Sequence, residues 1–192
     1  MKPKLYFKYG TMSSSKSANL LMINHNYKKQ GKKALLVKPN IDNRDGVEYI
    51  SSRAGFKELA DIIVDNKTNL YEEIYDKIDK YDCVLVDESQ FLSIDNVLDL
   101  RKITKFIPVI CYGLKTDYKC ELFTGSKCLL EVADKIEEIK TICVNCNSKA
   151  IVNAKYLIDN NGKKNIIKSS SKIVDVGGDE LYQPMCWVCW NN

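Results

Sequence analysis

The stretch LYFKYGTMSSSKS, residues 5–17, predicts a short apolar strand that leads into a phosphate-binding turn. Gly10, Lys16 and Ser17 occupy the first-glycine, lysine and hydroxyl positions of the pattern G-x-x-x-x-G-K-[ST]. In such a loop the backbone N–H groups surround a phosphate, the lysine reaches the β/γ oxygens and the hydroxyl ligates magnesium. The next segment, SANLLMINHNYKKQ (17–30), has a helical pattern that would direct its N-terminus at the anion.

Ser15 departs from this pattern, because the second glycine is expected at its position. A residue with a Cβ atom must therefore adopt whatever backbone conformation the turn requires there. The alternative interpretation is a serine-rich turn in which Ser13, Ser14 or Ser15 only caps the following helix. The segment by itself leaves nucleotide binding and helix capping both open.

Length and composition indicate one globular domain, or one domain with a small appendage. The chain has 192 residues, of which 45% are hydrophobic and 28% are charged. The net charge of +4 comes from scattered lysines without a run of five, so we expect no nucleic-acid partner. The N-terminus lacks the apolar core of a signal peptide and no stretch of about 18 apolar residues occurs. We therefore expect no membrane association and a cytoplasmic location.

Apolar runs and helical patterns alternate along the first 140 residues. We expect strands at Lys32–Pro39, within DCVLVDESQFL (82–92) and within FIPVICYGL (106–114), and a loop over 41–56. We expect helices over 56–64, 70–80 and 94–104, with a loop and helix over 115–130. This alternation predicts an α/β fold, a P-loop (RecA-like) parallel sheet flanked by helices. Ligands of such sheets bind at the carboxyl ends of the strands, where Gly10, Asp42, Asp87 and Leu114 would lie.

Asp87 and Glu88 directly follow the apolar run 83–86. A P-loop needs a second acid on a neighbouring strand to hold Mg²⁺ through water, and Asp87 follows Lys16 by 71 residues, a separation that suits two strands of one sheet. We therefore predict that Ser17 and Asp87 organise Mg²⁺ with ATP, while Glu88 acts on the nucleophile. The alternative is that both acids only solvate a strand end or cap the next helix.

The C-terminal segment contains two C-x-x-C pairs, Cys143 with Cys146 and Cys186 with Cys189. Four thiolates suffice for a closed tetrahedral structural zinc site. The 39 residues between the pairs exceed the spacer of a compact ribbon and require an inserted hairpin, for which AIVNAKYLI (150–158) and IVDVG (173–177) are the β-prone runs. We predict a nucleotide-binding domain over 1–140 and a zinc-binding β domain over 141–192. Four free thiols or a redox pair are the alternatives.

The remaining single residues are weaker candidates. His25, the only histidine, falls in the first predicted helix and is expected to be a surface or packing residue. The other cysteines are expected to be small core hydrophobes: Cys83, Cys111, Cys120 and Cys128. Four aromatic residues are either core residues or stack on a base: Phe91, Tyr118, Phe123 and Tyr182.

Seven segments together resemble the zinc-containing (type II) thymidine kinase family, bacterial and human-cytosolic-like. They are LYFKYGTMSSSKS, KPNIDNRDG, SSRAGF, VLVDESQFL, VICYGLKTDYKCELFTGS, KTICVNC and VGGDELYQPMCWVC. The segments VLVDESQFL and YGLKTD are the most specific, and the set runs nearly from end to end of the chain.

The resemblance implies transfer of the ATP γ-phosphoryl group to the 5′-hydroxyl of thymidine or deoxyuridine, giving dTMP in nucleotide salvage. It implies that Glu88 is the general base and that Arg44 neutralises charge on the transferring group. The implied ATP site consists of Gly10, Thr11, Met12, Ser13, Ser14, Ser15, Lys16, Ser17, Asp87 and Gln90.

The resemblance also implies a nucleoside pocket closed by a lasso near residues 176–182, which the zinc site would root. Its implied residues are Met12, Asp42, Phe91, Leu114, Tyr118, Phe123, Val176, Gly177, Gly178 and Tyr182. A homotetramer and feedback inhibition by dTTP are further implications.

Three positions depart from the family pattern: Ser15, Ala18 and Cys120. Because strain at Ser15 would weaken ATP binding or slow turnover, we predict a working but less efficient enzyme. Two rival functions stay open. The D-E-S-Q box and a zinc lobe also suit a nucleic-acid-dependent P-loop ATPase, and Ser15 also suits a non-catalytic nucleotide-binding relative.

Overall fold

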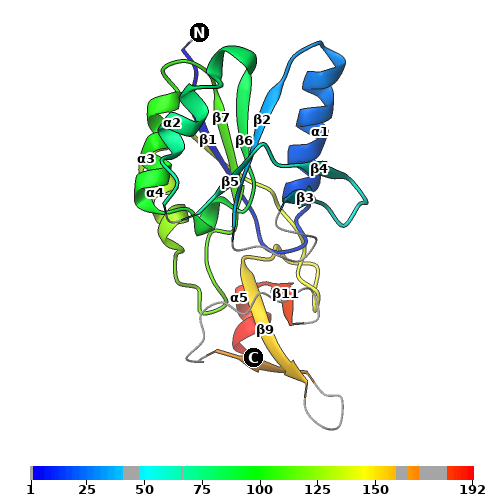
Figure 1. Cartoon of the computed structure of the whole chain (residues 1–192). Coiled ribbons are helices and arrows are strands. Elements are labelled where there is room, and N and C mark those ends of the chain that lie inside the picture. Colours follow the sequence, from blue (N-terminus) through cyan, green and yellow to red (C-terminus); the bar gives the residue numbers. More distant parts are fainter. Residues whose placement is uncertain (1, 41–47, 66, 159–163, 169–180) are drawn as a thin grey trace.

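The computed structural model describes residues 2–40, 48–65, 67–158, 164–168 and 181–192. Its larger part is a six-stranded sheet in the order β5-β2-β6-β7-β1-β8, in which all neighbouring strands are parallel (Figure 1). The strands are β1 (Leu5–Tyr9), β2 (Ala34–Pro39), β5 (Ile62–Val64), β6 (Cys83–Val86), β7 (Val109–Gly113) and β8 (Lys135–Glu138). The predicted α/β class with a parallel sheet is confirmed.

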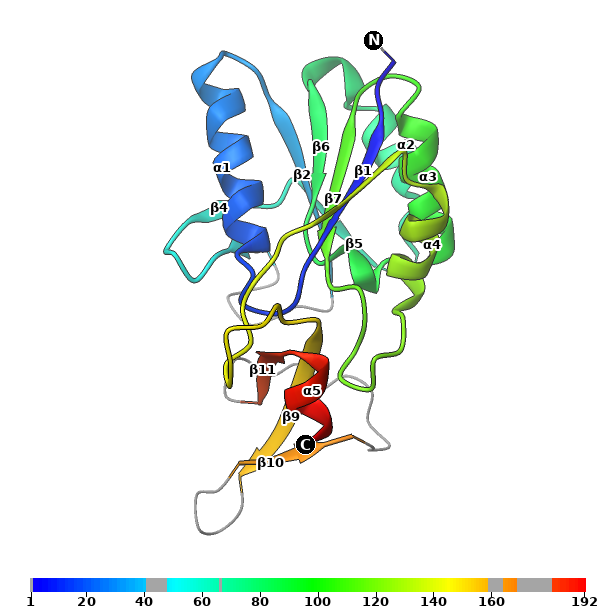
Figure 2. The same cartoon turned by 180° about the vertical axis from the view of Figure 1, so that it is seen from behind.

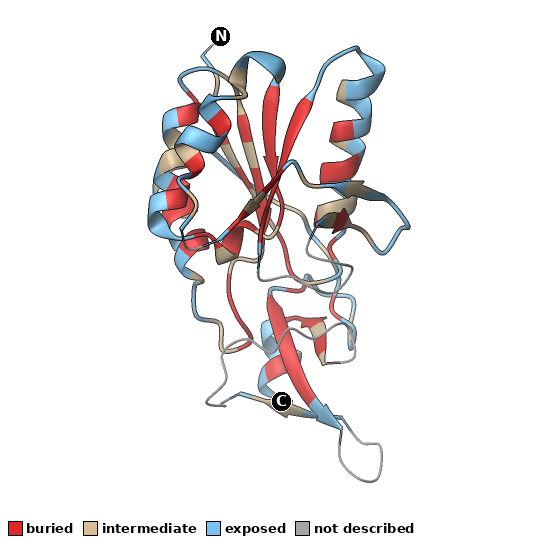
Figure 3. Ribbon diagram, viewed as in Figure 1, coloured by how far each residue is buried: buried red, intermediate tan, exposed pale blue. Residues whose placement is uncertain are grey.

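Helices cover both faces of this sheet, with α1 (Lys16–Lys29) on one face and α2 (Leu70–Tyr75), α3 (Ile94–Ile103) and α4 (Thr124–Val132) on the other (Figures 1 and 2). Successive residues of β2 explain this double cover, because side chains alternate along a strand. Leu35 packs in the same cluster as residues of α2 and α3, whereas Leu36 packs with Leu20 and Leu21 of α1. The central strands β2 and β6 are accordingly buried along their whole length (Figure 3), and His25 is exposed on α1, as predicted.

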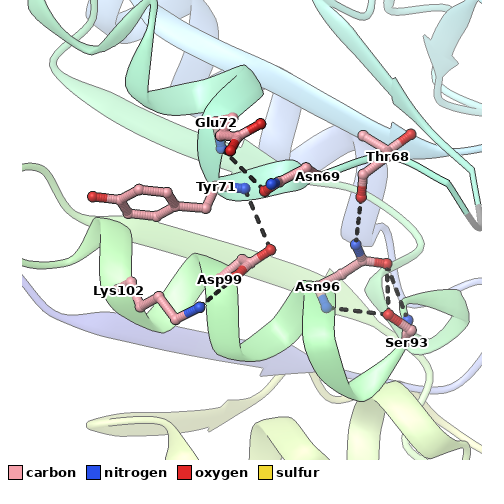
Figure 4. A network of polar contacts seen from close by, with 8 residues as sticks. All are labelled: Thr68, Asn69, Tyr71, Glu72, Ser93, Asn96, Asp99 and Lys102. Carbon is pink, nitrogen blue, oxygen red and sulfur yellow. Dashed lines mark hydrogen bonds and ion pairs between the residues drawn. The ribbon is translucent and has the colours of Figure 1, made fainter.

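A polar network fixes the start of α3 directly after the segment that carries the two acids (Figure 4). Ser93 caps the helix, because its Oγ accepts from the Asn96 amide at 3.1 Å while the Asn96 side chain accepts from the Ser93 amide at 3.3 Å. Asn96 also donates to the Thr68 carbonyl at 3.4 Å, and Asp99 accepts from the Tyr71 amide at 3.4 Å. These bonds join α3 to the beginning of α2.

The predicted helix over 56–64 is wrong. This segment instead forms β4 (Lys57–Leu59) and then β5, which joins the edge of the large sheet beside β2. The loop predicted over 41–56 contains a short strand, β3 (Tyr49–Ser51), which pairs with β4 in antiparallel orientation. Pairing with β2 here overrides the local helical spacing, because it places Ile62 and Val64 in the buried core with residues of α2 and α3. The predicted helix over 70–80 is confirmed in part, as α2 followed by a 3₁₀ turn, η1 (Ile78–Lys80).

The C-terminal part is a three-stranded antiparallel sheet in the order β10-β9-β11, followed by the short helix α5 (Trp187–Asn191). Its strands are β9 (Val152–Ile158), β10 (Lys164–Ile167) and β11 (Tyr182–Met185). The hairpin expected between the cysteine pairs is present as β9–β10, whereas the run 173–177 lies outside the described residues. This sheet lies at the carboxyl end of the parallel strands (Figures 1 and 2). The domain boundary at residue 140 stays a prediction.

None of the helices in the described part of the chain has the length and apolar character needed to span a membrane.

Candidate active site

The loop between β1 and α1 turns tightly at Gly10. The Gly10 amide donates to the Gly113 carbonyl at 3.2 Å, which ties the loop to the end of β7. A Cβ atom on Gly10 would lie 2.3 Å from Ser14 Oγ and 2.5 Å from the carbonyl oxygen of Ile139. Because the second contact is with backbone, which cannot move aside cheaply, only glycine fits at this position.

Lys16 begins α1 and folds back over the loop. Its side chain is buried, and its Nζ donates to the Thr11 carbonyl at 2.7 Å and to Ser14 Oγ at 3.5 Å. Thr11 and Ser14 are themselves buried, and the Ser14 amide donates to the Thr11 carbonyl at 3.3 Å. The ammonium thus lies against loop oxygens, a position from which it can exchange them for phosphate oxygens.

Ser15 adopts the left-handed conformation, with φ +61° and ψ +30°. It is the N-cap of α1 by position, yet its side chain makes no capping hydrogen bond. Ser13 in the same loop also has φ +61°. Residues other than glycine rarely adopt this backbone conformation, which costs each of them about 1–2 kcal/mol. The loop therefore imposes on Ser15 the backbone that a glycine would adopt without strain.

Asp87 directly follows β6, and its amide donates to the Val37 carbonyl at 2.9 Å. Its carboxyl group is buried and is hydrogen-bonded to the Ser17 side chain. Burial, and next the charge of Glu88, raise the pKa of Asp87 to about 7, although the bond from Ser17 and the nearby Lys16 act in the opposite direction. The two residues predicted to organise Mg²⁺ thus lie in contact, Ser17 from the first turn of α1 and Asp87 from the end of β6.

Glu88 follows in a left-handed conformation, with φ +48°, and begins the 3₁₀ turn η2 (Ser89–Phe91). Its Oε2 accepts a hydrogen bond from Gln90 Nε2 at 2.5 Å. Gln90 is buried, and its Oε1 in turn accepts from the Leu114 amide at 2.9 Å. Because Gln90 is anchored at the end of β7, it fixes the direction of the Glu88 carboxylate. A Cβ on Gly113 would lie 2.7 Å from that Oε1, so the bond needs glycine there.

The four predicted aromatic nucleoside residues fall into two groups, and Met12 and Leu114 are half-buried. Phe91 and Phe123 make an edge-to-face contact with centroids 5.6 Å apart. Tyr118 and Tyr182 are both buried.

Lys155 on β9 joins the two tyrosines and was not predicted from the sequence. Its side chain is buried, and its Nζ lies 5.1 Å from the ring centroid of Tyr118 and 5.9 Å from that of Tyr182. Asn153, two positions earlier and on the same side of the strand, is also buried, and it contacts the phosphate loop. In the sequence, these two residues could have been recognised as polar residues at alternate positions of the apolar run 150–158.

Arg53, in the hairpin between β3 and β4, also reaches the loop, because its Nη1 donates to Ser13 Oγ at 2.6 Å. Arg53 lies in the family-like segment SSRAGF but was not among the predicted site residues. Five predicted site residues lie outside the described residues: Asp42, Arg44, Val176, Gly177 and Gly178.

The four cysteines of the C-x-x-C pairs converge, and their Sγ atoms all lie within 4.8 Å of one another. Amides of Asn145 and Cys189 donate to Cys143 Sγ and Cys186 Sγ, each at 3.4 Å. Hydrogen bonds from Ser148 lower the pKa of Cys146 to about 6, which favours the thiolate. This cluster could hold a metal ion.

The other cysteines lie elsewhere. Cys83, Cys111 and Cys128 are buried in the core of the large sheet, as predicted. Cys120 is only partly buried, packs beside the core of the C-terminal sheet and has φ +68°.

Comparison with known proteins agrees with these features. A model of the thymidine kinase family matches residues 3–190. Proteins named thymidine kinase are similar at 45% identity over 188 residues in Shouchella clausii (97% of this chain, 95% of the relative) and at 44% over 191 residues in Listeria monocytogenes serovar 1/2a (98% and 97%). The relative from Lactiplantibacillus plantarum is 43% identical over 185 residues (95% and 93%).

Among solved structures, the Pif1 helicase from Candida albicans superposes with a TM-score of 0.42 at 13% identity, over 73% of this chain and 36% of the helicase. A likeness this low indicates nothing about activity. The family match, in contrast, includes the phosphate loop, both acids and all four clustered cysteines. The chain therefore belongs to the thymidine kinase family.

Proposed function

We propose that the protein transfers the γ-phosphoryl group of ATP to the 5′-hydroxyl of thymidine or deoxyuridine, giving dTMP and ADP. The observation that carries the proposal, beside family membership, is the contact of Ser17 with Asp87 immediately next to Glu88. It places a P-loop hydroxyl, a second acid and a separate carboxylate at one edge of the sheet, which are the groups that phosphoryl transfer requires.

In this proposal the phosphate loop and the Lys16 ammonium bind the ATP phosphates. The amides of Gly10, Met12 and Ser14 donate within the protein and shape the loop. Mg²⁺, when bound with ATP, neutralises phosphate charge, and Ser17 and Asp87 would hold it. Glu88 accepts the proton of the 5′-hydroxyl while the 5′-oxygen attacks the γ-phosphorus in line and ADP leaves. Gln90 keeps the Glu88 carboxylate in one direction during this step. The proposed roles of Asp42 beside the sugar and of Arg44 on the transferring group rest on the family resemblance.

The thymine ring is proposed to bind among Met12, Leu114 and the two aromatic groups, with the backbone of 176–182 reading its edge. The buried Tyr118 and Tyr182 beside Lys155 support a preformed wall on the side of the C-terminal sheet. A pocket bounded by fixed rings discriminates by shape and would exclude the larger purines.

The metal in the cysteine cluster is proposed to be zinc. Four thiolates at about 2.3 Å from a tetrahedral Zn²⁺ lie about 3.8 Å apart, and the Sγ atoms of Cys146 and Cys186 are 3.7 Å apart, as are those of Cys146 and Cys189. Four protein ligands leave no open position, so the ion would be structural and would root the lasso near 176–182. A homotetramer, inhibition by dTTP, a cytoplasmic location and a role in nucleotide salvage complete the proposal from the family resemblance.

Incubation of the purified protein with Mg-ATP and a panel of deoxynucleosides, followed by chromatography, tests the proposed reaction. We expect monophosphates of thymidine and deoxyuridine but not of purine deoxynucleosides. ATP hydrolysis stimulated by single-stranded DNA, without any nucleoside monophosphate, would instead indicate the nucleic-acid-dependent ATPase. Binding of ATP or thymidine without product would indicate a non-catalytic relative.

Ser15→Gly is expected to raise kcat/KM for ATP several-fold, because glycine adopts φ +61° without the penalty of about 1–2 kcal/mol. Steady-state kinetics of the two proteins measures the change. Ser15→Ala is the matched control, since it removes the hydroxyl but keeps the Cβ atom, and it should not gain activity. An unchanged or lower rate in the glycine variant would contradict the strain argument.

Asp87→Asn is expected to melt several degrees above the wild type at pH 8 while losing kinase activity. The pKa of Asp87 is raised from 3.8 to about 7, so its protonated form suits the fold, and this favourable contribution is lost as the pH rises through about 7. The difference in melting temperature should therefore shrink at pH 5. Thermal unfolding without Mg²⁺ or nucleotide measures it, with the exposed Asp79→Asn as control. Equal melting temperatures at pH 8 would show that the buried charge is not penalised.

A further inference from the structure

The side chain of Asn153 on β9 is hydrogen-bonded to the phosphate loop. Its Oδ1 accepts from the Met12 amide at 2.7 Å, and its Nδ2 donates to the Thr116 carbonyl at 3.0 Å. We propose that Asn153 is a positioning residue for nucleotide binding, through which the C-terminal sheet sets the geometry of the phosphate loop. This inference rests on the proposed function and extends it.

The side-chain amide of Asn153 is buried, and both its oxygen and its nitrogen are hydrogen-bonded. The side chain is 3% exposed, so loss of either bond would leave a buried backbone group of Met12 or Thr116 without its partner. Met12 lies between the tight turn at Gly10 and the left-handed Ser13. A hydrogen bond at that point fixes the middle of the loop, and Thr116 fixes Asn153 to the segment after β7. The side chain therefore connects three segments that are distant in sequence.

The cysteine cluster lies close to this connection along the chain. In the pairing of β9 with β11, Val152 is opposite Met185 and Asn153 is opposite Pro184. Met185 directly precedes Cys186, and β9 begins six residues after Cys146. Both cysteine pairs therefore border the place where β9 and β11 meet. A metal ion that holds the pairs together would hold Asn153 in register with the loop.

Asn153→Ala is the first test, with Val152→Ala as the matched control. Val152 is equally buried, but neighbouring side chains of a strand point to opposite faces, so its loss weakens the same sheet without touching the loop. For Asn153→Ala we expect the Kd for Mg-ADP, measured by calorimetry, to rise about tenfold, the effect of leaving one buried amide unsatisfied. The Met12 amide should also exchange hydrogen about tenfold faster, while the metal content stays unchanged.

Unchanged Mg-ADP affinity and Met12 exchange in Asn153→Ala would overturn the proposal, as would an equal effect in Val152→Ala. If the alanine variant does not fold, Asn153→Ser replaces it, because a hydroxyl can make only one of the two contacts well. A Kd of Asn153→Ser for Mg-ADP that lies between the wild-type value and a value tenfold higher supports the proposal. A wild-type Kd together with a wild-type exchange rate of the Met12 amide overturns it. Met12 exchange does not depend on phosphoryl transfer, so it separates failure of this inference from failure of the proposed function.

Removal of the metal by a chelator is a second test of the proposal. In the wild type it should raise both the Kd for Mg-ADP and the exchange rate of the Met12 amide. In Asn153→Ala it should change neither further, because the connection is already broken. Independent, multiplying effects would overturn the coupling through Asn153.

Discussion

Glu88→Gln is expected to lower kcat for thymidine phosphorylation by about 10²–10⁴-fold, with the KM values for ATP and thymidine changed less than about threefold. Glutamine has the shape of glutamate and can still contact Gln90, but it cannot accept the proton of the 5′-hydroxyl. The loss should therefore appear in the chemical step. Single-turnover measurements of dTMP formation, beside steady-state kinetics, separate that step from product release.

Asp95→Asn is the matched control for this variant, because it removes an exposed carboxylate from the start of α3, seven residues further on. It should keep wild-type kinetics. Glu88→Asp retains the charge but draws the carboxylate back by one methylene, so an intermediate rate is expected. A rate for Glu88→Gln within tenfold of the wild type would exclude Glu88 as the general base.

Cys146→Ser is expected to abolish metal retention, from one ion per chain to nearly none, and to expose the C-terminal sheet to hydrogen exchange. The sheet has three short strands and a small core, which is marginal for independent stability. Structural zinc sites supply about 10–16 kcal/mol of folding free energy in small domains, so loss of one thiolate removes the main support of this part. Metal analysis and amide exchange of β9 measure the two effects.

Cys120→Ser is the control for this experiment. Cys120 packs beside the same core but does not belong to the four-sulfur cluster, so its variant should keep the metal and the exchange pattern. If Cys146→Ser has wild-type exchange in β9, and the wild type holds no metal, the cysteines are free thiols or a redox pair. That was the alternative interpretation of the C-x-x-C spacing.

Local patterns were sufficient where the chemistry needs residues close together in the chain. Gly10, Lys16 and Ser17 lie within eight residues. The position of Asp87 after an apolar run correctly indicated a strand of the same sheet, although β7 lies between that strand, β6, and β1. The C-x-x-C pairs likewise indicated a converging cluster with an inserted hairpin. The left-handed backbone at Ser15 followed from the missing glycine.

The same patterns failed where distant pairing decided the structure. Residues 56–64 have a helical spacing but form β4 and β5, since pairing of β5 with β2 brings Ile62 and Val64 into the core. The edge strand β8, with no residue fully buried, has no apolar run by which it could be recognised. Its place is set by pairing with β1.

The sequence by itself determined the phosphate loop, the two acids, the four cysteines and the alternation of strands and helices, because each depends on spacing along the chain. Only the tertiary structure decided that the Leu114 amide anchors Gln90, that Lys155 lies near the rings of two tyrosines and that Asn153 holds Met12. These contacts join segments up to 141 residues apart. Side chains so far apart meet only when sheet pairing and core packing bring their strands together, and neither is encoded in a local spacing.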